Sequence, residues 1–564
     1  GSSGCGSRIK DDTQPRTFRF PFVWMASSFL LGLLVGSSGC GAGLLAGYWS
    51  RKRADEEDHR TPATIDSEGS IGPEGPTPRR KHQDALKFRR SGSAAFARNE
   101  MTLVDEKLVI AMVGLPARGK SYISRAVIRY LNFLGCQVRL FNAGNLRRAS
   151  GQAGVSSDFF NPHNAEAKQQ RERMAMQCLD DTIEFLNSVK GCVSVGILDA
   201  TNTTIERRSH VFDRVAQEPG ISLLFLESIC EDDAMLQENY RLKLKNADYD
   251  GADACQAQAD FMKRVKQYEQ AYQPVEDVED GVARNYIKMV DAGRKLIKCR
   301  GSDQRSKSDV VPKLVFDLLG SLHLGTRTIF LMVVAPSEND VKGVLGGDTG
   351  LAPLGKERAR ALRSFLCARE AEEKENAQVI CGTHQRHLET VSLLKKVGCG
   401  GNRTRRVLKM QRMNEMCVGT FDNMSVAEIE QLYPEEAESR RKDKLNYRYP
   451  GEGGESYQDL VSRMHEHILR LEQYQGSTVV ICDKRVCRVL LAYFRDTPLK
   501  DMPYLKVPTE LVELERSHSG FHEKLHSMPW RGRVSGLYEP GSPHLSVGHE
   551  DSFDRFLRTQ VSMD

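Results

Sequence analysis

The sequence predicts an α/β protein with two mainly parallel sheets in separate domains, preceded by a hydrophobic N-terminal helix. Length is the first observation behind this prediction, because 564 residues exceed the roughly 250–300 residues that one hydrophobic core holds. The second is a pattern of short apolar runs alternating with amphipathic stretches, which begins near Lys107 and again near Thr328. Such alternation is typical of parallel strands joined by right-handed helical crossovers. We place the boundary between the two domains near residue 325.

Composition narrows the class of protein. The chain is 40% hydrophobic and 27% charged, which is typical of globular proteins, and its 80 basic and 75 acidic residues give a net charge of only +5. This balance gives no reason to expect a nucleic-acid partner, although it is compatible with a local basic pocket for a phosphorylated substrate. The 14 cysteines show no C-x-x-C pair and no metal-ligand spacing. Such scattered cysteines are typical of reduced thiols in a cytosol-facing protein.

The N-terminal region differs from the rest of the chain. Residues 1–20 form a polar, basic tail, and no residue of 21–49 is charged. A helix crosses a hydrocarbon core with about 20 apolar residues, so segment 21–49 is long enough to be a transmembrane helix. Trp24 and Trp49 stand near its two ends, where aromatic side chains suit membrane interfaces. The alternatives for this segment are a targeting sequence that is removed and a glycine-rich disordered tail.

Basic residues at 51–53 directly follow the apolar segment, so the positive-inside rule favours a cytosolic position for this flank. The two domains would then be cytosolic and anchored to a membrane through residues 21–49. Residues 50–100 are polar and rich in turn-forming residues, which predicts a disordered linker.

The apolar runs define the elements of both domains. The first domain is predicted to span 101–325 and the second 326–525, with an irregular tail at 526–564. Segment 121–135 is amphipathic and predicts a helix directly after the first strand. We expect buried strands at 108–114, 137–142, 192–199 and 221–228 in the first domain, and at 328–334, 379–383, 477–483 and 511–515 in the second.

A glycine-rich loop joins the first strand to this helix. Residues Gly114 to Ser121 read G-x-x-x-x-G-K-S, and glycines at these places let successive backbone N–H groups and the helix N-terminus face phosphates. We expect Lys120 to reach the terminal phosphates of a nucleotide and the Ser121 hydroxyl to bind Mg²⁺. The strand before and the helix after the motif argue against a chance glycine-rich turn. The nucleotide-binding stretch is thus Gly114, Leu115, Pro116, Ala117, Arg118, Gly119, Lys120, Ser121 and Tyr122.

A carboxylate follows another predicted strand. Asp199 ends the apolar run VGILD, where it is suited either to hold Mg²⁺ through water or to accept the proton of an attacking hydroxyl. The alternative is that Asp199 caps the next helix. Together with the glycine-rich loop, this residue predicts a phosphotransferase or nucleotide hydrolase, without naming the acceptor.

Several longer strings name an acceptor by resemblance. In order, GLPARGKSYIS, RYLNFLG, FNAGNLRR, DATNTTIERR, LESIC and FMKRVKQYE resemble the 6-phosphofructo-2-kinase/fructose-2,6-bisphosphatase family, from about residue 107 to 520. The resemblance implies a kinase half that uses ATP and Mg²⁺ to phosphorylate the 2-hydroxyl of fructose 6-phosphate. It also implies a second half with the histidine-phosphatase fold, which is phosphoglycerate mutase-like, and it leaves a homodimer open.

The resemblance also implies a binding site for the sugar phosphate. Guanidinium groups suit phosphate oxygens, and a lysine neutralises charge on the transferred group, so Lys243 would act with Lys120 and Asp199 in catalysis. Three positions depart from the family pattern, namely Leu146 for tyrosine, Ile205 for arginine and Ser121 for threonine. The matching substrate positions are Arg147, Arg171, Arg207, Lys243, Arg264 and Tyr268.

The second half has lost the residues that the resemblance calls catalytic. Val333 and Val334 stand where the family has an arginine and the nucleophilic histidine, Val344 replaces another arginine, and Asp483 replaces the second histidine. Valine has no lone pair, so covalent catalysis by that route is impossible. We assign nucleophilic roles to neither His384 nor His387. The vestigial pocket would comprise Val334, Arg386, Glu415, Tyr433, Arg440, Lys444 and Asp483, and Arg488 also matches a substrate-pocket position of the family.

These observations predict a monofunctional 6-phosphofructo-2-kinase whose phosphatase-like half is structural or regulatory. The surviving pocket residues could be inherited ion pairs, or they could bind a sugar phosphate without cleaving it. A membrane-anchored pseudoenzyme that binds ATP or sugar phosphate without turnover is the alternative to the kinase. A complete bifunctional enzyme is disfavoured by Val334 and Asp483.

Overall fold

The computed structural model describes residues 106–527, apart from 153, 245–247, 250–252, 302–308, 324–326, 374–376, 396–404 and 518–519. These residues belong to one compact unit, 76–564. The predicted basic tail, membrane helix and linker lie outside the described residues, as do position 325 and nearly all of the predicted C-terminal tail. Within the described part of the chain, no helix is long and apolar enough to cross a membrane.

The first sheet has six strands in the order β2-β3-β1-β4-β7-β8. Its strands are parallel except for β8, which runs antiparallel to β7. The three central strands are almost wholly buried, as expected for near-continuous apolar runs in a parallel sheet. The bounds are β1 Lys107–Val113, β2 Gln137–Asn142, β3 Ser194–Asp199, β4 Ile221–Ile229, β7 Tyr286–Val290 and β8 Lys295–Cys299.

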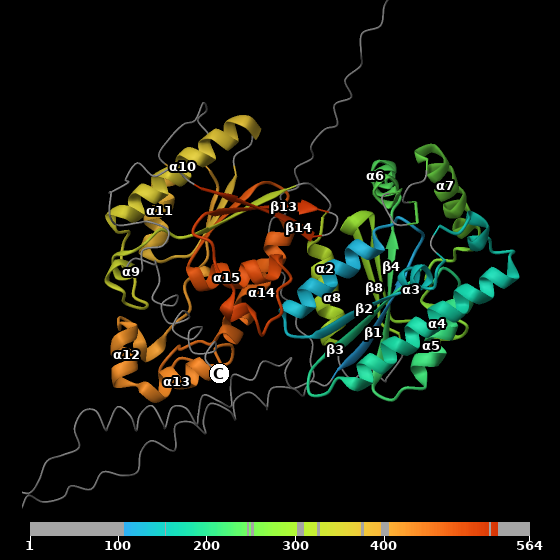
Figure 1. The fold of residues 1–564 in the computed structure, drawn as a ribbon, viewed down its shortest axis with the longest axis horizontal. Coiled ribbons are helices and arrows are strands. Elements are labelled where there is room, and N and C mark those ends of the chain that lie inside the picture. The colour runs from blue at the N-terminus through green and yellow to red at the C-terminus, as the bar shows by residue number, and fades with distance from the viewer. Residues whose placement is uncertain are drawn as a thin grey trace, which may run out of the picture. The chain divides into compact units, whose positions relative to one another are not determined.

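Helices cover both faces of this sheet (Figure 1). Helices α2 and α8 pack against one face, and α4 and α5 pack against the other. Asparagine or threonine side chains cap the starts of α3, α4 and α5, each accepting a backbone N–H of the first turn. The bounds are α2 Lys120–Phe133, α3 Ala143–Ala149, α4 Ala165–Ser188, α5 Ile205–Ala216, α6 Asp233–Leu244, α7 Ala254–Ala271 and α8 Val310–Ser321.

The second sheet also has six strands, in the order β11-β10-β12-β9-β13-β14. Its first four strands are parallel, and β13 and β14 add an antiparallel edge. The strand predicted at 511–515 is the start of β13, whereas β14 was not predicted. The bounds are β9 Thr328–Val333, β10 Gln378–Cys381, β11 Val407–Lys409, β12 Thr478–Cys482, β13 Leu511–Ser517 and β14 Gly520–His526; a two-stranded ribbon, β5 Val278–Glu279 and β6 Val282–Ala283, lies outside both sheets.

The second sheet is likewise covered on two sides. Helices α10 and α11 pack on one face, and α14 and α15 pack on the other. The core under α14 and α15 is continuous with the core under α2 and α8, so the two sheets share one hydrophobic interior. The bounds are α9 Glu338–Lys342, α10 Pro353–Glu373, α11 Gln385–Lys395, α12 Val426–Leu432, α13 Pro434–Lys442, α14 Tyr457–Gln473 and α15 Lys484–Phe494.

The predicted fold class is confirmed for the described residues. Each half is an α/β domain built on a mainly parallel sheet. The carboxyl ends of parallel strands meet at one edge of a sheet, which is where ligands bind in such folds.

Candidate active site

The glycine-rich loop lies between β1 and α2, as predicted. Gly114 has φ +135°, and a Cβ there would lie 2.5 Å from the carbonyl oxygen of Ser228. Gly119 has φ +85° and immediately precedes the first residue of α2. Residues other than glycine rarely adopt these backbone angles. The loop can therefore bring its backbone N–H groups, and the N-terminus of α2, to one side of a pocket.

Lys120 is the first residue of α2, and its side chain is buried. Its ammonium donates hydrogen bonds to the carbonyl oxygens of Gly114, at 2.8 Å, and Leu115, at 2.6 Å. Burial lowers the pKa of Lys120 to about 7, with Asp199 opposing this shift and Lys243 adding to it. A lysine in this state takes up a proton readily when an anion approaches.

Asp199 ends β3 and lies beside the loop. Its Oδ2 accepts hydrogen bonds from the Ser121 hydroxyl, at 3.1 Å, and from the Asn142 amide, at 2.6 Å. Thr204, and not Asp199, caps the following helix α5. A hydroxyl and a carboxylate oxygen this close are hard ligands of the kind Mg²⁺ prefers. The described residues hold no cluster of three or more His, Cys, Asp or Glu suited to a metal. Ser121 and Asp199 are the residues that would hold a magnesium ion here, together with the phosphates of a nucleotide.

One pocket of about 690 Å³ brings the loop and the predicted sugar-phosphate residues together. All six predicted positions line it, namely Arg147, Arg171, Arg207, Lys243, Arg264 and Tyr268. Of the predicted nucleotide-binding stretch, Gly114, Leu115 and Arg118 do not line it. Arg118 instead donates to the Tyr240 hydroxyl at 3.1 Å and pairs with Glu269 at 3.6 Å.

Carboxylates and aromatic rings hold the arginines in place. Both carboxylate oxygens of Asp248 accept from Arg147 at 2.7 Å, and Asp248 also pairs with Arg264 at 3.5 Å. Arg264 lies over the ring of Phe160, 3.7 Å from its centroid. On the other side of the pocket, Arg207 donates to Glu172 at 2.6 Å. These contacts reduce the rotamer freedom that the arginines would otherwise lose on binding a phosphate.

Sequence reasoning missed some pocket residues and flagged others that lie elsewhere. Asn142 was missed, although its place at the carboxyl end of β2, paired with Asp199 on β3, could have indicated it. Asp248, Glu172 and Phe160 carry no such signal, because they meet the arginines only after folding. Leu146 and Ile205, the departures from the family pattern, do not line the pocket.

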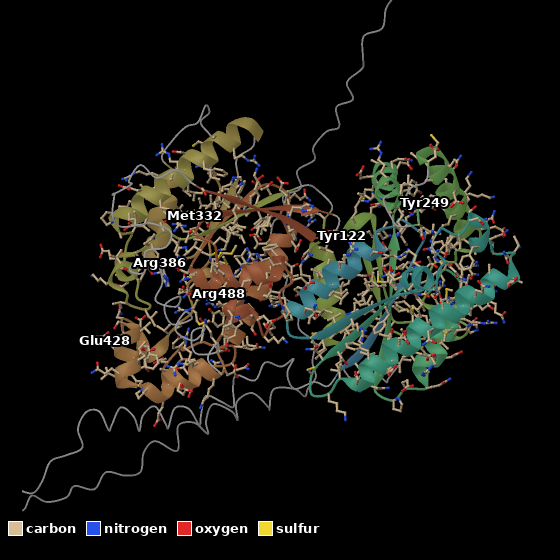
Figure 2. All side chains as sticks on the ribbon, in the orientation of Figure 1. Tyr122, Tyr249, Met332, Arg386, Glu428 and Arg488 are labelled. Carbon is tan, nitrogen blue, oxygen red and sulfur yellow. The ribbon has the colours of Figure 1, made fainter. Side chains whose placement is uncertain are left out.

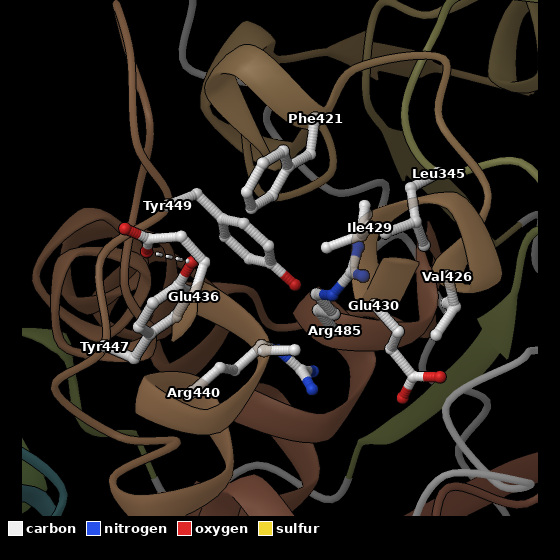
Figure 3. Close-up of a pocket in the computed structure, with 11 residues that line it drawn as sticks. Leu345, Phe421, Val426, Ile429, Glu430, Glu436, Arg440, Tyr447, Tyr449 and Arg485 are labelled. Carbon is white, nitrogen blue, oxygen red and sulfur yellow. Dashed lines mark hydrogen bonds between the residues drawn. The ribbon is translucent and has the colours of Figure 1, made fainter. Parts of the chain in front are cut away.

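The second domain contains a smaller pocket of about 40 Å³, shown in Figure 3. Arg440 and Arg485 line it together with Glu430 and Glu436. The Tyr447 hydroxyl donates to Glu436 at 3.0 Å. Of the predicted vestigial residues, only Arg440 lines this pocket. Tyr433 packs on Phe421, with ring centroids 5.1 Å apart, and Lys444 lies 5.3 Å from the ring centroid of Tyr504.

Asp483 carries a buried ionic network. It accepts from Arg386 at 2.7 Å and lies 2.8 Å from His387 Nε2. Burial alone would raise the pKa of Asp483, but His387 and Arg386 outweigh it and hold the pKa well below its usual range. Nearby, burial raises the pKa of Glu415 to about 6, and Arg485 lies 3.8 Å from it. Val334, directly after β9, is buried in the core.

Comparisons with known proteins decide the family. Residues 98–312 match the family 6-phosphofructo-2-kinase, and residues 337–528 match the histidine phosphatase superfamily (branch 1). A rat protein named 6-phosphofructo-2-kinase/fructose-2,6-bisphosphatase 3 is 36% identical over 411 residues, which cover 73% of this chain and 70% of the rat protein.

The chain belongs to the 6-phosphofructo-2-kinase/fructose-2,6-bisphosphatase family.

Its kinase half makes it an enzyme of the 6-phosphofructo-2-kinase type by family, as the sequence predicted. A Saccharomyces cerevisiae relative named 6-phosphofructo-2-kinase 1 is 37% identical over 424 residues, covering 72% of this chain. The chain spans about half of that relative's own length, 50%. A Schizosaccharomyces pombe relative named as a probable 6-phosphofructo-2-kinase is 31% identical over 522 residues, 82% of this chain and 76% of the relative.

Proposed function

We propose that this chain transfers the γ-phosphoryl group of ATP to the 2-hydroxyl of fructose 6-phosphate, giving fructose 2,6-bisphosphate and ADP. The observation that carries the proposal is one pocket with a phosphate-binding loop at one side and a cluster of basic residues at the other. The family and the names of its relatives support the choice of acceptor.

Each residue has a task in this reaction. The loop N–H groups and Lys120 hold the β- and γ-phosphates, and bound Mg²⁺ would neutralise charge on their oxygens. Arg147, Arg171, Arg207 and Arg264 grip the 6-phosphate and fix the sugar in line with the γ-phosphoryl group. Lys243 stabilises charge on the transferred group. Its side chain lines the same pocket as Asp199 and Arg264 and is close enough to both for their charges to act on it.

Asp199 suits either of two tasks. Its carboxylate can hold the metal with Ser121, or it can accept the proton of the attacking 2-hydroxyl. The hydrogen bonds from Ser121 and Asn142 support the first task. They hold Oδ2 of Asp199 next to the Ser121 hydroxyl, which would be the second protein ligand of the metal.

We further propose that the second domain does not hydrolyse fructose 2,6-bisphosphate. Val334 offers no lone pair for a phosphoenzyme. In addition, Asp483 already neutralises Arg386, which matches the phosphate-binding arginine of the family. A negative carboxylate at this place repels a phosphate dianion.

The test is product formation by the full chain. The protein is incubated with Mg-ATP and fructose 6-phosphate, and fructose 2,6-bisphosphate is quantified, with Lys120→Met as the blank. A parallel sample receives the bisphosphate alone. Product that depends on Lys120 and then persists supports a one-way kinase. Nucleotide binding without product would instead support a ligand-binding pseudoenzyme, and loss of the added bisphosphate would support a bifunctional enzyme.

The predictions of a membrane anchor at residues 21–49, of cytosolic catalytic domains and of a homodimer stay proposals from the sequence. Extraction of membranes with alkaline carbonate tests the anchor, because an integral protein stays in the pellet. Analytical ultracentrifugation tests the dimer.

A further inference from the structure

Helix α2 borders the large pocket at its N-terminus and contacts the second domain further along its length. Its N-terminus, at Lys120 and Ser121, borders the large pocket. Its outer side, further along, contacts the second domain. Phe133 packs edge-on against Tyr493 of α15, with ring centroids 5.7 Å apart. Arg129 lies over the rings of Tyr493, at 5.0 Å, and Phe521, at 5.2 Å.

Arg129 belongs to a buried ionic cluster centred on Glu472 of α14. Glu472 pairs with Arg129 at 3.2 Å and with Arg327 at 2.6 Å, and it also accepts from Arg516 of β13. The Tyr493 hydroxyl donates to it at 2.8 Å. One carboxylate thus joins α2 to three elements of the second domain and to the segment preceding β9.

The cluster depends on this carboxylate more than on any one arginine. The side chain of Glu472 is 0% exposed, and those of Arg129, Arg327 and Arg516 are 9%, 0% and 6% exposed. Burial alone would raise the pKa of Glu472, but the three guanidinium groups hold it below its ordinary value. Loss of Glu472 would leave three buried cations without their shared counter-charge, whereas loss of Arg129 leaves the carboxylate still paired.

Tyr122 brings this cluster close to the phosphate loop. It follows Ser121 directly, and Arg129 lies two helical turns further along the same side of α2. Burial raises the pKa of Tyr122, and Arg516, Glu472, Arg129 and Arg327 are the charged groups that act on its hydroxyl. Tyr122 is labelled in Figure 2, on the side of the first sheet that α2 covers.

We propose that Glu472, acting through Arg129, is a positioning residue for the nucleotide site. The second domain thereby holds α2, and with it the backbone N–H groups that bind the nucleotide phosphates. This inference rests on the proposed function, and it gives the phosphatase-like domain a task in the kinase reaction that needs no chemistry of its own.

The proposal predicts a selective effect. Arg171 on α4 and Arg207 on α5 come from the opposite face of the first sheet, and neither contacts the Glu472 cluster. A shift of α2 would therefore displace the phosphate loop and leave this part of the sugar-phosphate site in place. A displacement of about 1 Å in a positioned group costs up to about 100-fold in rate, so a partial loosening of α2 should be measurable.

The experiment compares two arginine variants of the full chain. Arg129→Met keeps most of the side-chain volume and removes the link between α2 and Glu472. Arg369→Met is the matched control, because Arg369 pairs with buried Glu513 at 2.6 Å within the second domain, and none of the contacts described for it involves α2. For Arg129→Met we expect the dissociation constant of ATP to rise about tenfold, with the KM for fructose 6-phosphate unchanged. Amide hydrogen exchange should also quicken at residues 121–125, and Arg129→Lys should restore part of the affinity.

Three results would overturn the inference. The first is ATP affinity and amide exchange that match those of Arg369→Met. The second is an equal loss of affinity for both substrates, which would indicate general loosening of the fold. The third is a Glu472→Gln variant that folds, as judged by circular dichroism, and binds ATP as tightly as the wild type. Wild-type protein that binds ATP without making product would refute the proposed function alone, since the comparison of dissociation constants and amide exchange would still test the inference.

Discussion

The two pockets described here both contain arginines, but they differ in how many acidic side chains balance the positive charge. Nine basic and four acidic side chains line the first pocket, so it keeps a positive surplus for anionic ligands. Two basic and two acidic side chains line the second. Close to the second pocket, Asp483 also neutralises Arg386 with the chain's own carboxylate. An arginine therefore indicates a phosphate site only when no carboxylate of the protein already neutralises it.

Burial explains why the difference matters. A carboxylate fixed within about 3 Å of a guanidinium in a buried site competes with any incoming phosphate, and it does so without losing translational entropy. In the first pocket, Asp248 contacts Arg147, Arg148 and Arg264, and Glu172 contacts Arg207, so these two carboxylates restrain four arginines. The remaining basic residues of the pocket still outnumber Asp199 and Glu206. The contrast predicts different effects of mutation in the two regions. Changes of charged residues in the first pocket should mainly weaken ligand binding and catalysis, whereas a change at Asp483 should mainly lower the free energy of unfolding.

The largest effect should follow Asp483→Asn. This change leaves Arg386 and His387 without their buried carboxylate, so the free energy of unfolding should fall by about 3–5 kcal/mol. Thermal or urea denaturation measures the loss. The matched control is Glu466→Gln, which removes an exposed pair with Arg412 and should cost about 1 kcal/mol or less. Equal, small losses for both variants would show that Asp483 does not neutralise a buried charge. Inorganic phosphate should stabilise the Asp483 variant more than the wild type.

Lys120→Met should nearly abolish kinase activity. The variant loses the positive charge at the phosphates, which should lower kcat by about 100–1,000-fold. Formation of fructose 2,6-bisphosphate is the measurement. Lys313→Met serves as the control, because Lys313 is exposed on α8 and pairs only with Asp317 among the contacts described. A variant at position 120 with near-normal kcat would place the nucleotide elsewhere.

Arg171→Met should weaken fructose 6-phosphate binding selectively. A hydrogen bond to a charged group contributes about 1.5–3 kcal/mol, so the KM for the sugar phosphate should rise by roughly 10–100-fold while the KM for ATP stays unchanged. Steady-state kinetics with each substrate varied in turn gives both constants. Arg214→Met, on α5 but outside the pocket, is the control. A rise in the KM for ATP instead would move Arg171 to the nucleotide side of the pocket.

The smallest predicted effect is a pH dependence. The pKa of Lys120 is lowered to about 7 by burial, so the side chain is charged below that pH and becomes neutral above it. Between about pH 7 and 8 the charged fraction falls about fivefold, and kcat/KM for ATP should fall with it. A guanidinium stays charged at these pH values, so the Lys120→Arg variant should lose this limb of the profile. A wild-type profile that is flat from about pH 7 to 9 would contradict the lowered pKa.

Local sequence was sufficient to predict the loop and the strands that carry the first pocket. The G-x-x-x-x-G-K-S run needs only its own glycines, the preceding strand and the following helix, all of which are neighbours in sequence. The same holds for Asp199, because the end of an apolar run is visible without any long-range contact. The basic positions Arg147, Arg171, Arg207, Lys243 and Arg264, by contrast, depended on a family resemblance.

Tertiary structure decided which charges remain for a ligand. Asp248 lies far from Arg147 in sequence, Asp483 far from Arg386, and Glu472 far from Arg129, and each pair forms only when the sheets and helices have packed. No periodicity or motif predicts such pairs, because a charge's effect depends on what lies within a few ångströms and on how much water is excluded. The sequence by itself therefore determined the fold class and the phosphate loop. The packing of distant segments determined that one arginine cluster keeps its surplus charge, that Asp483 neutralises Arg386, and that a third cluster joins α2 to the second domain.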